Sequence, residues 1–111
     1  MITRLDMNRL REITEGDAAL ERQLFHLFIE SVDRLLQLLA VQIQDGSLQW
    51  RQTVHQIKGA SANMHVTSMV ALCISIEKLE NEAHRREQIT QLHEVYQQVR
   101  AELVAAMAQP Q

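Results

Sequence analysis

Apolar residues recur at intervals of three and four along most of the chain, the spacing of amphipathic helices. The longest such stretch begins after Asp17, which is a good N-cap, and ends near Gly46. The apolar positions of this predicted helix are Leu20, Leu24, Leu27, Phe28, Val32, Leu35, Leu38, Leu39 and Ile43. Three more apolar residues, Phe25, Ile29 and Leu36, lie beside this stripe and make its apolar face unusually wide.

The same spacing predicts four further helices. A short one covers residues 5–13, and Ser47 is expected to cap the next, which runs to about Met64. Thr67 or Ser68 is expected to cap a helix with apolar residues as far as Ala83, and polar residues 81–88 mark its end. The last helix carries apolar positions across residues 89–106. Four long helices with short connections predict an all-α, antiparallel up-down-up-down four-helix bundle with a short extra N-terminal helix.

Bulk composition narrows the class of protein. The 111 residues fit one domain, 1–111, and the formal charge of −3 leaves no broad basic face for nucleic acid. Cys73 is the only cysteine, so a disulfide within the chain is impossible and a reducing compartment is expected. Residues 1–6 lack a signal-peptide core, and no run of about 18 apolar residues could span a membrane. We expect a free-standing, cytoplasmic monomer.

A histidine and a lysine share one surface of the predicted helix 47–64. At about 100° per residue, Gly59 lies about 40° from His55 on one side and Lys58 about 60° on the other. The apolar residues of that helix gather on the opposite side. His55 is therefore expected to face solvent, with a cation one turn on and no bulky side chain beside it. Gly59 costs roughly 1 kcal/mol relative to alanine in a helix interior, so its presence calls for a reason.

The segment His55-Gln-Ile-Lys-Gly-Ala-Ser resembles the motif of the histidine-containing phosphotransfer (HPt) domain, as does Leu72-Cys-Ile-Ser-Ile-Glu77 in the next helix. Leu10-Arg-Glu-Ile13 with Gly16-Asp17, and Phe28, extend the resemblance over nearly the whole chain. One position departs from the family pattern, because His65 stands where a glycine is usual. We expect an altered turn there, or a helix that runs slightly further.

The resemblance implies a phosphorelay intermediate, in which His55 carries a phosphoryl group between aspartates of receiver domains. Lys58 would stabilise the phosphoryl oxygens, and Gly59 would let the partner approach. The partners would be a response-regulator receiver domain and a hybrid sensor kinase. No cofactor is expected in this chain, since Mg²⁺ would come from the receiver, and no ATP-dependent kinase activity is expected because a Gly-rich phosphate loop is missing.

Two further roles depend on how the helices meet. If the chain turns back near Val66, His55 lies level with Glu77, which could accept a hydrogen bond from the Nδ1–H group and leave Nε2 free to attack. A small apolar patch beside His55 is expected to dock the receiver. The candidate partner-binding residues are Leu48, Arg51, Gln52, Ala62, Phe25 and Ile29.

Two other interpretations remain open. The same fold could serve as a degenerate adaptor that binds a receiver without phosphotransfer, and the replacement of glycine by His65 gives this reading some support. A plain structural or oligomeric bundle would show no dependence on His55. Cys73 is read as a small buried apolar residue, and Ser61 as a helix-edge residue that bonds back to a carbonyl one turn earlier.

Overall fold

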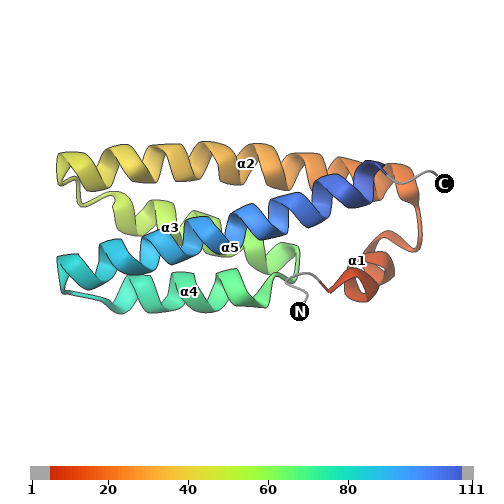
Figure 1. Ribbon diagram of the computed structural model, residues 1–111. Helices are drawn as coiled ribbons and strands as arrows, with labels where there is room; N and C mark the ends of the chain where they lie inside the picture. The colour runs from red at the N-terminus through yellow and green to blue at the C-terminus, as the bar shows by residue number, and fades with distance from the viewer. Residues whose placement is uncertain (1–5, 109–111) are drawn as a thin grey trace.

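A computed structural model describes residues 6–108, which form helices and connecting turns. The helices are α1 (Met7–Thr14), α2 (Ala18–Asp45), α3 (Trp50–Asn63), α4 (Thr67–Lys78) and α5 (Glu82–Ala108). Helices α2 to α5 run alternately up and down as an antiparallel bundle, and α1 lies at one end (Figure 1). The all-α four-helix bundle with a short N-terminal helix is therefore confirmed. No helix in residues 6–108 is both long and apolar enough to cross a membrane.

The helices pack in a ring, so that each of the four has two neighbours. Helix α3 packs against α2 and α4, and α5 packs against the same two helices from the other side. Within the described residues, α3 and α5 have no close backbone approach and touch through the guanidinium of Arg85, which lies 4.2 Å from the centre of the Trp50 ring. Helices α2 and α5 extend beyond the α3–α4 turn, and α1 packs on α2 near that extension (Figure 1). One face of α3 consequently remains uncovered along the side of the bundle.

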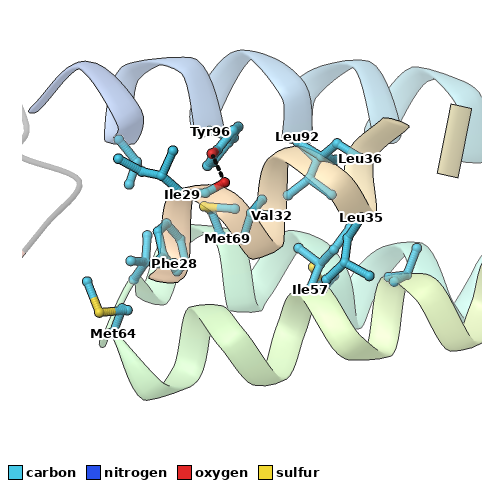
Figure 2. Packing of buried hydrophobic residues seen from close by; sticks show 14 of the residues in the cluster. Phe28, Ile29, Val32, Leu35, Leu36, Ile57, Met64, Met69, Leu92 and Tyr96 are labelled. Carbon is cyan, nitrogen blue, oxygen red and sulfur yellow. Dashed lines mark hydrogen bonds between the residues drawn. The ribbon is translucent and has the colours of Figure 1, made fainter. Parts of the chain in front are cut away.

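The core is a continuous layer of aliphatic side chains between the helices (Figure 2). Val32, Leu39, Ile57, Met69 and Leu92 are all 0% exposed. The hydroxyl of the buried Tyr96 of α5 donates toward α2, where Ile29 O lies at 3.2 Å (Figure 2). Asp33 Oδ1, also on α2, lies 2.6 Å from the same hydroxyl. This bond fixes α5 against α2 and satisfies a phenol that would otherwise be costly to bury.

Helix α2 packs through a different part of its wide apolar face than the sequence suggested. Phe25, Ile29 and Leu36 are 2%, 8% and 4% exposed, whereas Leu27 and Leu38 are 60% and 44% exposed. Leu20 is 39% exposed as well, so the expectation that Leu20, Leu27 and Leu38 belong to the core stripe is wrong. The packed arc is displaced because α5 covers the flank that carries Ile29 and Leu36, as the Tyr96 contact shows.

Both ends of α2 follow the predicted signals. The Asp17 carboxylate accepts a hydrogen bond from Leu20 N at 3.1 Å, which is the expected N-cap. Gly46 closes the helix with a φ of 71°, the left-handed conformation that favours glycine. Helix α1 begins at Met7 and ends one residue later than predicted, and Leu5 of the prediction lies outside the described residues.

The predicted capping residues of α3 and α4 are wrong. Helix α3 begins at Trp50, and Ser47 Oγ instead accepts from Gln49 N in the preceding turn. Neither Thr67 nor Ser68 caps α4, because the cap position is taken by Val66, whose side chain is 0% exposed and serves the core.

Helix α4 ends at Lys78 and not near Ala83, which belongs to α5. The Asn81 carboxamide accepts from His84 N at 3.0 Å and so starts α5 early. Arg85 holds the same turn by donating to Leu79 O and Glu80 O.

His65 adopts the backbone that the family glycine would adopt. Its φ is 54°, while His65 N donates to Ala62 O at 3.0 Å and Val66 N donates to Ser61 O at 2.9 Å. These two bonds form a Schellman motif, in which the left-handed position is usually glycine. The helix ends at Asn63. The expected altered turn or longer helix is therefore wrong, since the usual turn is made with a histidine at its strained position.

Candidate functional site

The uncovered face of α3 presents His55, because the other side of the helix is held in the core. Val54 and Ile57 are 0% exposed, and Thr53 Oγ1 donates a buried 2.7 Å hydrogen bond to Gln42 Oε1 of α2. These contacts fix the rotation of α3 about its axis. The His55 side chain is left 68% exposed, as the helical spacing predicted.

Glu77 of α4 lies between His55 and Lys58 of α3. Its Oε1 is 3.4 Å from His55 Nδ1, and its Oε2 accepts a 3.1 Å hydrogen bond from Lys58 Nζ. The side chains of Lys58 and Glu77 are 24% and 21% exposed, so the ion pair sits half-sheltered at the α3–α4 boundary. The predicted proximity of His55 and Glu77 is confirmed by this geometry. The contact between Lys58 and Glu77 was not predicted.

One oxygen of the Glu77 carboxylate is an unsatisfied hydrogen-bond acceptor. Oε1 is shielded from solvent and has no hydrogen-bond partner among residues 6–108, while His55 Nδ1 is the nitrogen that faces it. Buried carboxylate oxygens rarely lack donors. A hydrogen on Nδ1 meets this need and makes Nε2, the other ring nitrogen, the one with a free lone pair. The arrangement can therefore hold an exposed imidazole in a nucleophilic tautomer.

Gly59 is not required by the fold. A Cβ built on it would meet nothing within 4 Å, apart from the local helix, and its φ is not positive. Packing within the protein therefore does not explain why position 59, beside His55, carries no side chain. Ser61 has a structural role, since its buried hydroxyl donates to Ile57 O at 2.7 Å as predicted.

The residues predicted to contact a partner divide into two groups. Leu48 is 87% exposed at the turn before α3, and Arg51, Gln52 and Ala62 are exposed on α3. Phe25 and Ile29 lie in the core, so the expectation that they form part of an exposed patch is wrong. Their flank of α2 faces α5, away from His55.

Helix α2 carries exposed apolar side chains. Leu20, Leu27 and Leu38, which the sequence assigned to the core, are 39%, 60% and 44% exposed, and Val41 is 54% exposed. Leu27 also lines an apolar pocket of about 280 Å³ formed by α1, α2 and α3, where Ala60 and Asn63 contribute from α3. Apolar surface therefore lies where α2 meets the C-terminal half of α3. The width of the apolar stripe was the only signal of this surface in the sequence.

Cys73 lies one turn before Glu77 on α4 and is fully buried, as predicted. The pKa of its thiol is raised to about 12, mainly by burial and also by the negative charge of Glu77, while the positive charge of Lys58 acts in the opposite direction. A neutral thiol is a poor nucleophile and a poor metal ligand. Cys73 therefore packs beneath the site and takes no part in its chemistry.

Comparison with known families gives one clear result. A family model described as the Hpt domain matches residues 23–102, which include α3, α4 and every member of the His55–Glu77–Lys58 group. Comparison with curated proteins and with solved structures gives no match.

Proposed function

The chain belongs to the Hpt domain family, and from this premise we propose that it relays phosphoryl groups through His55. Hpt domains act in phosphorelays by histidine phosphotransfer. The observation that carries the assignment to His55 is its exposed ring, with Nδ1 directed at a carboxylate oxygen that lacks any other donor. That arrangement directs the lone pair of Nε2 outward, where a partner can reach it.

In the proposed reaction, Nε2 attacks the phosphorus of an aspartyl phosphate on a receiver domain. The N–P bond forms as the P–O bond breaks, and the electron pair of that bond leaves with the aspartate carboxylate. Lys58 Nζ, now 3.1 Å from Glu77 Oε2, is within reach of a phosphoryl group on the same helix face and supplies positive charge to it. The receiver provides Mg²⁺ for the remaining charge.

The docking surface proposed for the receiver surrounds His55 on α3. Leu48, Arg51, Gln52 and Ala62 are exposed around it, and Gly59 removes the side chain that would stand nearest the imidazole. The partners on either side of the relay are a receiver domain and a hybrid sensor kinase. Replacing Leu48, which is 87% exposed, by aspartate is expected to weaken receiver binding without changing the fold. Unchanged affinity would place the docking surface elsewhere.

The direct test is to incubate the full chain with a phosphorylated receiver domain and follow the label. We expect an acid-labile, alkali-stable phosphoryl group that is absent in His55→Gln and retained in His26→Gln, which removes another exposed histidine from α2. A chain that binds the receiver but gains no label would instead support the adaptor. Label retained in His55→Gln would exclude His55 as the carrier.

Glu77 is proposed as the residue that positions His55. Removing its carboxylate in Glu77→Ala frees the ring to rotate and to adopt the other tautomer, so phosphotransfer is expected to slow by on the order of tenfold while the circular dichroism spectrum is unchanged. Unchanged transfer kinetics would remove Glu77 from the site.

A further inference from the structure

The phosphorylated ring needs a place for its second proton, and the carboxylate of Glu77 faces that position. We propose that Glu77 retains the Nδ1 proton of the phosphorylated His55, so that phosphoryl groups enter and leave the ring without any proton transfer. This inference rests on the proposed function and concerns the charge of the residue at position 77, beyond its ability to orient the imidazole.

The electron balance makes the proton important. When Nε2 bonds to phosphorus, the ring already carries hydrogen on Nδ1 and becomes a cation. When the phosphoryl group is passed on, the N–P bond breaks and its electron pair returns to Nε2. A ring that kept its Nδ1 proton then leaves as neutral imidazole, whereas a ring that lost it must leave as imidazolate, which is a far poorer leaving group.

The geometry provides the stabilising charge. Glu77 Oε1 lies 3.4 Å from Nδ1, is shielded from solvent, and has no other donor among residues 6–108. An opposite charge within about 4–6 Å favours the charged form of a titrating group and shifts its pKa by roughly one to three units. The cationic phosphorylated ring therefore keeps its proton to higher pH when residue 77 is a carboxylate than when it is an amide.

Two other groups act on the same carboxylate. Lys58 of α3 shares it through Oε2 and weakens its effect on the ring, and Cys73 of α4 lies near both charges. Burial raises the pKa of the Cys73 thiol to about 12, so it stays neutral over the relevant range. The ion pairs of α2 and α5 in the described part of the chain, Arg100–Asp33 and Arg86–Glu82, do not include Glu77.

The experiment uses the full chain phosphorylated by phosphoramidate, which transfers its phosphoryl group to histidine nitrogen and releases ammonia. Hydrolysis of the phosphohistidine is followed by ³¹P NMR from pH 5 to 10, and ¹⁵N-labelled histidine reports the Nδ1 proton. Glu77→Gln keeps an oxygen that can accept from Nδ1–H, so the ring stays positioned. We expect the alkaline fall in hydrolysis rate to move down by about one pH unit, together with loss of the Nδ1–H signal.

A second variant is expected to move the alkaline fall in hydrolysis rate in the opposite direction. Lys58→Gln removes the competing cation, and the alkaline fall is expected to move up. Glu94→Gln is the matched charge control, because Glu94 is exposed on α5, whose backbone does not approach α3 in the described residues. It is expected to leave the profile unchanged.

The outcomes separate this inference from the function on which it rests. An alkaline limb that is the same in the unaltered chain, Glu77→Gln and Lys58→Gln would overturn the role of the carboxylate while leaving His55 as the carrier. A purely structural role of Glu77 would change the rate at every pH without moving the limb. If His55 accepts no phosphoryl group from either phosphoramidate or a receiver, the proposed function itself is refuted.

Discussion

Replacing Gly59 by alanine is expected to make the protein more stable and less active. Glycine in a helix interior costs about 1 kcal/mol relative to alanine. Nothing lies within 4 Å of a Cβ built at this position, apart from the local helix, and its φ is not positive. Neither a clash nor backbone strain therefore offsets the gain. For a chain of this size, about 1 kcal/mol corresponds to a rise in Tm of about 4 °C.

The effect on phosphotransfer has the opposite sign because the new methyl group lies about 40° around the helix from His55. In the proposed reaction, this methyl group occupies space that the receiver needs to bring its aspartyl phosphate to Nε2 of His55. A steric cost of about 1.4 kcal/mol in the transfer complex lowers the rate about tenfold. Thermal unfolding measures the first effect, and single-turnover transfer from a phosphorylated receiver measures the second.

Thr90→Ala is a suitable control for stability alone. Thr90 is exposed on α5, and the change to a better helix former is expected to stabilise the chain by about 0.5 kcal/mol without touching α3. Transfer by this variant should equal that of the unaltered chain. A Gly59→Ala chain that is destabilised would show that the space beside Gly59 is occupied. Full transfer activity in a stabilised variant would refute the access argument.

Two further predictions concern the surroundings of the site. His65→Gly should raise the free energy of unfolding by about 1 kcal/mol, because glycine adopts a φ of 54° without the strain of an L side chain, and Gly46→Ala should lower it by a similar amount at a φ of 71°. Urea unfolding measures both changes. A destabilised His65→Gly chain would show that the imidazole makes a contact worth more than the strain. Cys73 should resist iodoacetamide at pH 8 in the folded chain, since its pKa is raised to about 12 by burial, and should react after unfolding in urea; rapid alkylation of the folded protein would contradict its burial.

The fold was largely predictable because its signals are local. Asp17 and Gly46 mark the ends of α2 through backbone preferences that need no tertiary contact. The α4–α5 boundary was harder to predict, since apolar spacing continues through Ala83. The break there depends on the Asn81 side chain and on Arg85, which donates to Leu79 O from the following helix. Such interactions form only once the turn exists.

The site was predictable where it depends on helix rotation and chain reversal. His55 lies eleven residues before Val66 and Glu77 eleven after it, so a turn at Val66 brings them level. The contact of Lys58 with Glu77 depends on rotamers of two long side chains, which the spacing of residues does not determine. The sequence did not indicate which part of the apolar face of α2 is exposed, because that face is wider than one neighbouring helix can cover. The position of α5 determines which part is buried.

The histidine at position 65 affects the stability of the turn more than the geometry of the site. A left-handed residue is required at this position because Val66 N must reach Ser61 O, and the 2.9 Å bond between them is made with His65 in place. Val66 is 0% exposed, so the core holds the start of α4 at the same level. The distance of 3.4 Å between His55 Nδ1 and Glu77 Oε1 is set by that level. The departure from the family glycine therefore costs about 1 kcal/mol of folding free energy and leaves His55, Lys58 and Glu77 assembled.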